Sequence, residues 1–276
     1  MATTQKAVSP KKNQGFQGIR AAIWVIVVCL IIAICIYNFL LGNPSNFAGN
    51  DPAGHPTNLL GTIYKGGIIV PIIQTLLLTV IALSIERWLA LRTAFGKGSL
   101  AKFVANIKAA VNKGDFAAAQ SICDKQRGSV ANVVSASIRA YKEMETATGL
   151  KKAQKVAKIQ QAHEEATQLE MPTLQMNLPI LATIVTLGTL TGLLGTVIGM
   201  IRSFQALAAG GGGDSLALST GISEALINTA FGILTSWCSV IAYNTFTNKI
   251  DKLTYALDEV GYTIAQTYEA NHTEEA

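Results

Sequence analysis

Residues 178–201 have the sequence LPILATIVTLGTLTGLLGTVIGMI, and this stretch decides the fold together with the apolar segment that follows it as far as Tyr243. A glycine-rich link, AAGGGGDS at residues 208–215, separates the two segments. Each segment is longer than the roughly 20 residues that a helix needs to cross a bilayer. We therefore predict two membrane-spanning helices joined by a short loop.

Glycines and hydroxyl groups pattern the first segment. Four glycines are spaced four, three and four residues apart, which places them on one helix face. They are Gly188, Gly192, Gly195 and Gly199. Such a face lets another backbone approach closely. Hydroxyl groups stand beside it, at Thr183, Thr186, Thr189, Thr191, Thr196 and Ser203. Because polar groups at membrane depth face other protein or water, we predict a close helix contact with a hydrated path beside it.

The second segment carries an acidic residue, Glu224, within GISEALINTAFG at residues 221–232. An ionised carboxylate near the centre of a membrane helix costs about 3 kcal/mol or more, so Glu224 needs a partner, water or a proton. Asn228 and Thr235 continue the stripe of Glu224, and Thr229 and Ser236 form a second stripe. Two polar stripes predict contacts on two sides of this helix.

Composition places the whole chain in the membrane class. Half of its 276 residues are hydrophobic, only 14% are charged, and the mean hydropathy is +0.35. The net charge of +5 does not indicate nucleic-acid binding, because the basic residues are spread along helices and not clustered with aromatics. The four cysteines show neither zinc-site nor disulfide spacing, which favours four unpaired thiols; they are Cys29, Cys35, Cys123 and Cys238.

No sequence pattern indicates catalysis. The chain shows no nucleophile and base pair and no metal-ligand set, and Gly210–Gly213 lacks the Lys-Ser/Thr ending of a phosphate-binding loop. We therefore expect that the protein is not an enzyme and holds no cofactor and no metal.

Basic residues define the expected topology. They are Lys6, Lys11, Lys12 and Arg20 before the first apolar run, fourteen Lys or Arg between Arg87 and Lys158, and Lys249 and Lys252 after the last run. The positive-inside rule then places both termini and the central region in the cytoplasm, which requires an even number of spans. The run Ala21–Leu41 is too long for a signal-peptide core and has no clear cleavage site, so we predict a retained helix.

These observations predict an all-α integral membrane protein with four spans and a cytoplasmic helical region. The expected segments are a disordered N-terminus (1–17), an extra membrane helix (18–41), a periplasmic loop (42–66), a membrane helix (67–91), the cytoplasmic helical region (92–177), a membrane helix (178–207), a periplasmic glycine-rich loop (208–217), a membrane helix (218–246), and a cytoplasmic C-terminal helix and tail (247–276).

Details of the second span and the central region add local predictions. Pro71 is tolerated in the first turn of its helix, and Glu86-Arg87-Trp88 is expected to anchor the other end at the membrane interface. Gly114-Asp115 is expected to cap a helix that starts at Phe116. The acidic residues of a later charged helix are expected to form a solvated face; they are Glu164, Glu165 and Glu170.

Four motifs together resemble the ExbB/TolQ/MotA proton-channel family, and most of all its ExbB members. They are LATI at 181–184, GLLGTVIGM at 192–200, ISEALINTA at 222–230 and YN at 243–244. The phrase GDFAAA at 114–119 resembles the cytoplasmic helical region of the same family. The resemblance covers roughly Gly67 to Leu257, and the additional first span departs from three-span members.

The resemblance implies a function and partners. ExbB-like subunits form a ring, typically a pentamer, around a dimer of ExbD-like single-span proteins whose membrane aspartate is protonated and released. The proton-motive force across the bacterial inner membrane then drives rotation, and a TonB-like protein transmits the work to outer-membrane transporters. Alternatives are a TolQ-like role in envelope maintenance, a gliding or flagellar stator, and a purely structural membrane scaffold.

The resemblance also implies site residues. Glu224 and Thr229 match the acidic and threonine positions of the family's last span, whereas the family's third-span threonine aligns with Leu187. Thr183, Thr186 or Thr191 could replace that missing hydroxyl. The expected proton-pathway residues are Thr229, Glu224, Thr191, Thr183, Thr186, Thr189, Thr196 and Asn228.

Overall fold

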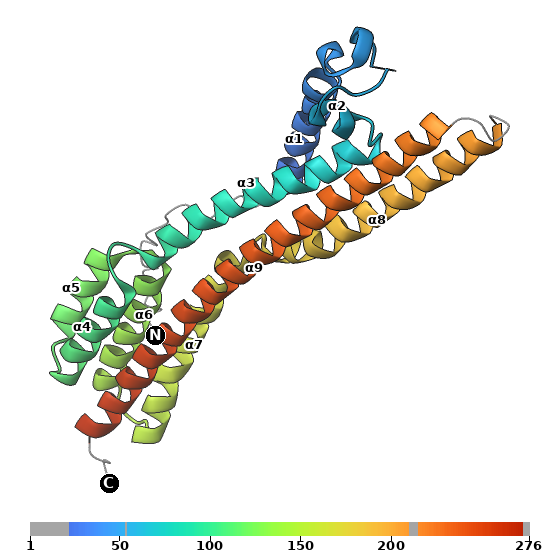
Figure 1. The fold of residues 1–276 in the computed structure, drawn as a ribbon. Helices are drawn as coiled ribbons and strands as arrows, with labels where there is room; N and C mark the ends of the chain where they lie inside the picture. The colour runs from blue at the N-terminus through green and yellow to red at the C-terminus, as the bar shows by residue number, and fades with distance from the viewer. Residues whose placement is uncertain (1–21, 53, 210–214, 273–276) are drawn as a thin grey trace, which may run out of the picture. The chain divides into compact units, whose positions relative to one another are not determined.

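The fold was analysed in a computed structural model that describes residues 22–52, 54–209 and 215–272. Figure 1 shows that the described chain is helical; its only strand-like feature is a bridge between Phe47 and Pro56. Four helical segments are long and apolar enough to cross a membrane, within Ala22–Leu41, Ile69–Asn112, Lys152–Gln205 and Leu218–Asn271. The predicted class, an all-α membrane protein with four spans, is confirmed.

The chain divides into two compact units. Among the described residues, the span unit comprises those within 22–87 and 177–247, and the bundle unit comprises those within 88–176 and 248–272. The main helices are α1 (Ala22–Cys35), α2 (Leu59–Tyr64), α3 (Ile69–Phe95), α4 (Leu100–Asn112), α5 (Phe116–Gln126), α6 (Gly128–Thr146), α7 (Lys152–Gln175), α8 (Leu178–Ala209) and α9 (Ser215–Asn271). Helices α3 and α9 contribute to both units.

In the span unit, α1 continues as a π-helical turn, Ile36–Leu41, and a folded loop follows it. Asn46 organises this loop, because its side-chain amide donates to the carbonyls of Leu40 (2.8 Å) and Leu41 (3.0 Å) and accepts from Asn58 (2.9 Å). Asn58 also accepts from the backbone amide of Gly61 and so caps α2. Buried polar groups of the loop are thereby paired, as burial requires.

The loop and the start of α3 pack on α9. Leu41, Ile63 and Val70 form a hydrophobic cluster against which Ile227 and Phe231 of α9 pack. The ring of Tyr37 in the π-helical turn stacks on that of Tyr64 in α2, with centroids 4.7 Å apart. Leu41 and the short helix α2 are therefore part of the packed core of the span unit, whereas most of the described residues of 43–58 are exposed.

At the other end of the span unit, α3 buries an ion pair. Arg87 Nε donates to Glu86 Oε2 at 2.6 Å, and a second bond joins Arg87 Nη2 to Glu86 Oε1. Asn177 Nδ2 donates to the same carboxylate at 3.3 Å. Arg87 is 0% exposed. Glu86 and Arg87 are therefore paired and buried inside the protein, whereas the neighbouring Trp88 is exposed; the position of this helix end at the membrane interface stays a prediction.

Helices α8 and α9 lie side by side in the span unit (Figure 1). The glycines of α8 face α9: a Cβ on Gly188 would meet the Gly232 carbonyl at 3.0 Å, and one on Gly192 would meet Thr229 Cα at 3.3 Å. Only hydrogen fills these positions, so the two backbones approach closely.

The bundle unit consists of the end of α3, the helices α4 to α7 and the C-terminal part of α9 (Figure 1). Asp115 caps α5, which begins at Phe116 as predicted, by accepting from the amide of Ala118 at 2.8 Å. The core contains one stripe from each element, including Ile107, Val134 and Ile264, each 0% exposed. Amphipathic periodicity therefore accounts for this bundle.

The prediction of a solvated acidic face on α7 is confirmed for two of its three residues. Glu164 and Glu165 are exposed, as expected. Glu170 is buried and accepts from Ser129 (2.9 Å) and Asn132 (3.4 Å), so its assignment to a solvated face is wrong. The hydroxyl and amide of α6 supply the hydrogen bonds that a buried carboxylate needs.

Some predictions concern segments outside the described residues. These are the disordered N-terminus (1–17), the glycine-rich turn at Gly210–Asp214, and the end of the tail after His272. All four cysteines are unpaired.

Candidate functional site

A line of paired hydroxyl groups follows the contact between α8 and α9. Thr196 Oγ1 and Thr229 Oγ1 are hydrogen-bonded to each other, and both lie within reach of the Gly192 carbonyl, at 3.2 and 3.3 Å. One hydroxyl can therefore donate to the carbonyl while the other donates to the first hydroxyl. This pair lies at the centre of the helix contact.

Further pairs extend the line along both helices. Thr189 Oγ1 donates to Ser236 Oγ at 2.8 Å, and Ser239 Oγ donates to the Leu181 carbonyl at 2.7 Å. In the other direction Ser203 Oγ donates to the Gly199 carbonyl at 3.0 Å. The stripe of Thr229 and Ser236 thus faces α8.

Glu224 lies beyond the hydroxyl pair and has a charged partner. Arg202 Nη1 of α8 is 3.5 Å from Glu224 Oε2, and the carboxylate side chain is 16% exposed. Lys65, in the connection before α3, is close enough to act on Glu224 electrostatically. Glu224 therefore has the charged partner that its burial requires, and this partner comes from the same chain.

Asn228 belongs to the stripe of Glu224 on α9 and joins it to the segment before α3. Its Nδ2 donates to the Gly66 carbonyl at 2.9 Å, and the residue is buried. Its Oδ1 has no hydrogen-bond partner among the described residues. The two stripes of α9 therefore contact two different elements of the span unit.

Three of the predicted hydroxyls lie apart from this line. Thr183 is exposed and donates to the Pro179 carbonyl of its own helix at 2.8 Å. Thr186 is exposed, Thr191 is half-buried, and within the described residues neither has a hydrogen-bond partner. Thr183, Leu187 and Thr191 share one face of α8, because they are four residues apart. This face is exposed at Thr183 and Leu187 and half-buried at Thr191.

Arg202 and Gly66 were not predicted from the sequence as partners of Glu224 and Asn228. A signal for Arg202 was present, because Arg202 and Glu224 lie eleven residues on either side of Gly213. The two members of each of the pairs Thr196–Thr229 and Thr189–Ser236 likewise lie at equal distances along the sequence from the point between Gly212 and Gly213. An antiparallel hairpin with a central turn brings such symmetric positions together. For Gly66, a backbone carbonyl far along the chain, no comparable signal existed.

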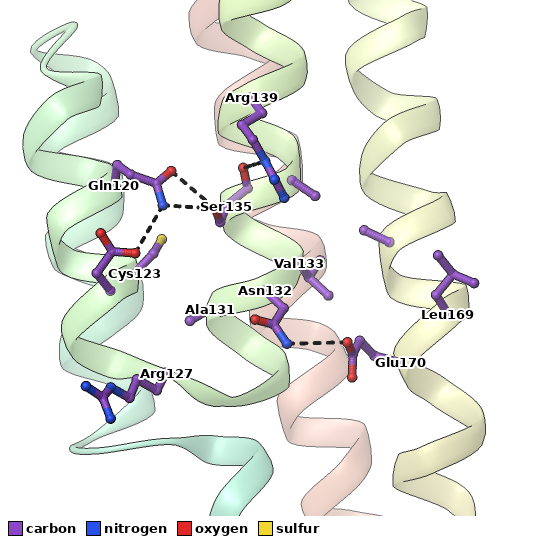
Figure 2. A pocket seen from close by; sticks show the side chains of 13 residues that line it. Gln120, Cys123, Arg127, Ala131, Asn132, Val133, Ser135, Arg139, Leu169 and Glu170 are labelled. Carbon is purple, nitrogen blue, oxygen red and sulfur yellow. Dashed lines mark hydrogen bonds between the residues drawn. The ribbon is translucent and has the colours of Figure 1, made fainter. Parts of the chain in front are cut away.

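A second candidate lies in the bundle unit, where a cavity of about 390 Å³ opens between α5, α6 and α7 (Figure 2). Its polar side chains are mostly paired with one another: Gln120 bonds Ser135 at 3.0 Å, and Asn132 bonds Glu170 at 3.4 Å. Arg139 Nε donates to the Ser135 carbonyl at 3.3 Å. Because these groups satisfy each other, they do not demand a ligand. No cluster of potential metal ligands occurs in the described part of the chain.

A comparison with known proteins finds a family match that includes the line of hydroxyl groups between α8 and α9. The sequence profile described as the MotA/TolQ/ExbB proton channel family matches residues 130–259, which include α8, the hydroxyl pair and Glu224.

Individual relatives match over different lengths. The Tol-Pal system protein TolQ of Pseudomonas aeruginosa is 28% identical over 224 residues, which cover 78% of this chain and 92% of that protein. The putative biopolymer transport protein ExbB-like 3 of Synechocystis is 37% identical over 87 residues, 31% of this chain and 41% of that protein. ExbB of Helicobacter pylori is 39% identical over 80 residues, 29% of this chain and 55% of that protein. The matches to these two proteins thus span less than two thirds of their length.

Proposed function

Because the chain belongs to the MotA/TolQ/ExbB proton channel family, we propose that it is an ExbB-like subunit of a proton-driven motor in the bacterial inner membrane. In this proposal several copies, typically five, surround the membrane helices of an ExbD-like partner. Both termini and the bundle unit lie in the cytoplasm. The motor energises TonB-dependent transport across the outer membrane.

The observation that carries the proposal is the hydrogen-bonded pair of Thr196 and Thr229 in the α8–α9 contact. Thr229 is the residue that matches the family's pore threonine. Hydroxyl groups order water and pass hydrogen bonds, but they do not store a proton at neutral pH. A titrating carboxyl group from a partner completes the path, which is the role of the ExbD-like aspartate.

Two other features support different roles for the two polar faces of α8. Glu224, paired with Arg202, forms a charged end to the hydroxyl line. On the separate face of α8, Thr183 and Thr191 flank Leu187, the position where the family has a hydroxyl. We assign Thr191 and Thr183 to the surface that meets the partner helix or the next subunit, and Thr196 and Thr229 to the path within one subunit.

A TolQ-like role in envelope maintenance is the second candidate. The similarity to the Pseudomonas aeruginosa TolQ extends over 92% of that protein, whereas the matches to ExbB proteins are shorter. Complementation separates the two roles. Restored TonB-dependent uptake in a strain that lacks ExbB supports the first, and restored detergent resistance in a strain that lacks TolQ supports the second.

Proton flux tests the proposal directly. The chain and its ExbD-like partner are reconstituted in liposomes, and flux is measured under an imposed potential. We expect flux to require the partner and to fall strongly in Thr229→Val and in a partner Asp→Asn variant. Thr245→Val is the matched control, because Thr245 is exposed and its hydroxyl bonds only the Ile241 carbonyl of its own helix at 2.7 Å.

The structural-scaffold alternative makes the opposite prediction. If rings assemble and drive uptake equally well with Thr229→Val and Glu224→Gln, the polar line serves packing alone and the motor proposal fails. Intact assembly is checked by size and mass in both variants, so that loss of flux is not confused with loss of the ring.

A further inference from the structure

A buried histidine lies where three helices of the bundle unit meet. His163 of α7 is only 7% exposed. Its Nδ1 lies 2.8 Å from Ser137 Oγ of α6. Its other ring nitrogen, Nε2, is buried and has no hydrogen-bond partner among the described residues. The proton path proposed above does not use this residue, so the burial of a titratable ring here has another explanation.

The Nε2 edge of the ring packs against α9 at a glycine. A Cβ added to Gly261 would lie 2.5 Å from His163 Nε2, 2.6 Å from Cδ2 and 2.7 Å from Cε1. The same two helices meet again where the Thr254 hydroxyl donates to Met171 Sδ at 3.7 Å. Because the two contacts follow in opposite order along α7 and α9, these helices run antiparallel. The imidazole fills the space between them, and the missing side chain of Gly261 makes room for it.

The hydrogen bonds of the ring fit its neutral form. Ser137 Oγ donates its single proton to the Val133 carbonyl at 3.1 Å. The hydroxyl then accepts from Nδ1–H of His163, and this tautomer leaves Nε2 as a bare lone pair. A proton on Nε2 would add a charge and an N–H group at a buried atom that faces Gly261. Both cost free energy when they are buried without a partner, so the packed bundle resists protonation of His163.

Charged groups around the ring oppose the effect of burial. Burial lowers the pKa of His163 from its ordinary 6.5, whereas the carboxylates of Asp258 on α9 and Glu164 on α7 act to raise it. Both carboxylates belong to exposed residues. Helix α6 faces the ring with the uncharged hydroxyl of Ser137. The net effect keeps His163 neutral at neutral pH and leaves its protonation to acidic conditions.

We propose that His163 is a pH-responsive contact that loosens α7 from α9 when the solution around the bundle becomes acidic. The neutral ring fits against Gly261, whereas the protonated ring needs water at Nε2 and leaves its place. Only Met176 and Asn177 separate α7 from the membrane helix α8. The solution in question is the cytosol and the response regulates the motor only if the proposed function holds, but the pH response itself does not depend on that function.

Thermal unfolding of the purified full-length protein tests the contact at about pH 7.5 and about pH 5.5, on either side of the ordinary histidine pKa. Because the pKa is lowered in the folded state, the stability that the neutral ring supplies is complete above pH 6.5 and is lost as the pH falls below it. We expect the drop in thermal midpoint on acidification to be smaller by about 2 °C or more in His163→Gln than in the unmodified protein. His55→Gln is the matched control, since His55 is exposed in the span unit, and it should keep the full drop.

Two further variants change the response but retain the histidine. Gly261→Ala places a Cβ on the ring and displaces it, so we expect a lower midpoint at neutral pH and a smaller further drop on acidification. Asp258→Asn removes a carboxylate that favours the protonated ring, so the pKa of His163 measured by NMR of its imidazole should fall. Asp251→Asn removes another exposed carboxylate of α9, one that does not act on His163, and should leave this pKa unchanged.

Hydrogen exchange locates the loosened segment. After correction for the pH dependence of the intrinsic exchange rates, amide protection in α7 should fall on acidification in the unmodified protein and change less in His163→Gln. Equal acid-induced losses of midpoint and of protection in these two proteins overturn the proposal, and so does an NMR pKa of His163 at or above 6.5.

Proton flux separates this proposal from the proposed function. With the ExbD-like partner in liposomes, acidification on the bundle side should reduce flux less in His163→Gln than in the unmodified protein, and equal reduction overturns the regulatory role. Flux that is absent at every pH counts against the proposed function instead. The unfolding, NMR and exchange measurements need neither the partner nor flux, so they test the contact in either case.

Discussion

Arg202 Nη1 of α8 lies 3.5 Å from Glu224 Oε2 of α9, eleven residues on either side of Gly213. The acidic group that marks the last span is thus paired inside one subunit, before any partner protein is added. The pair lies at the charged end of the hydroxyl line, and Glu224 shares its stripe of α9 with Asn228.

A double-mutant cycle measures this pairing. Arg202→Gln, Glu224→Gln and the double variant are compared by thermal unfolding in detergent. The pair is partly exposed, so we expect a coupling free energy of about 0.5–1 kcal/mol, with the double variant less destabilised than the sum of the singles. Additive effects would show that the two charges do not interact. The more exposed pair Lys108–Glu259 is a suitable comparison and should couple less strongly.

Gly232→Ala tests the close contact of α8 and α9. A Cβ at this position would lie 2.6 Å from the Gly188 carbonyl oxygen and 2.7 Å from Gly192 Cα. Because both obstacles are backbone atoms, the helices must separate, and we expect a destabilisation of about 1–3 kcal/mol in denaturant unfolding. Ala230→Val adds more volume on an exposed face of the same helix and should cost less. Equal cost in the two variants would count against the contact.

The buried pair of Glu86 and Arg87 predicts an asymmetric response to mutation. Arg87→Met leaves the Glu86 carboxylate buried without its charge partner, which should cost about 3–5 kcal/mol of unfolding free energy. The double variant Glu86→Gln/Arg87→Met should recover much of that loss, because it removes the charge itself. Arg92→Gln, at an exposed position where the guanidinium stacks on Trp88 at 5.5 Å, should change stability little. A double variant as unstable as Arg87→Met would contradict this account.

Cys123 predicts a pH dependence in the bundle unit. Burial, and next the neighbouring Asp124 carboxylate, raises the pKa of the Cys123 thiol from its ordinary 9.0 to about 12. A raised pKa in the folded state gives a stability contribution that is complete below pH 9 and is lost as the pH rises from 9 towards 12. The stability lost on raising the pH from about 8 to about 10 should therefore be smaller in Cys123→Ala than in the unmodified protein. An equal loss in both proteins would refute the assignment.

The sequence by itself determined the class of the protein and the faces of its helices. Helical periodicity is a local property, so the spacing of Gly188, Gly192, Gly195 and Gly199 was enough to predict a smooth face on α8, and Asp115 was enough to predict where α5 begins. The symmetry of α8 and α9 about the glycine-rich link would also have been sufficient to pair Arg202 with Glu224.

Only the tertiary structure decided the state of individual charged and polar groups. Glu170 and Glu86 look from the sequence like ordinary solvent or interface residues, yet both are buried and accept hydrogen bonds from distant side chains, Glu170 from Ser129 and Glu86 from Asn177. Asn228 bonds the Gly66 carbonyl 162 positions away, and His163 packs against Gly261 of α9. Periodicity specifies which residues share a face, whereas the partner of that face depends on which remote segment packs against it, and burial of a charge is a property of that packing.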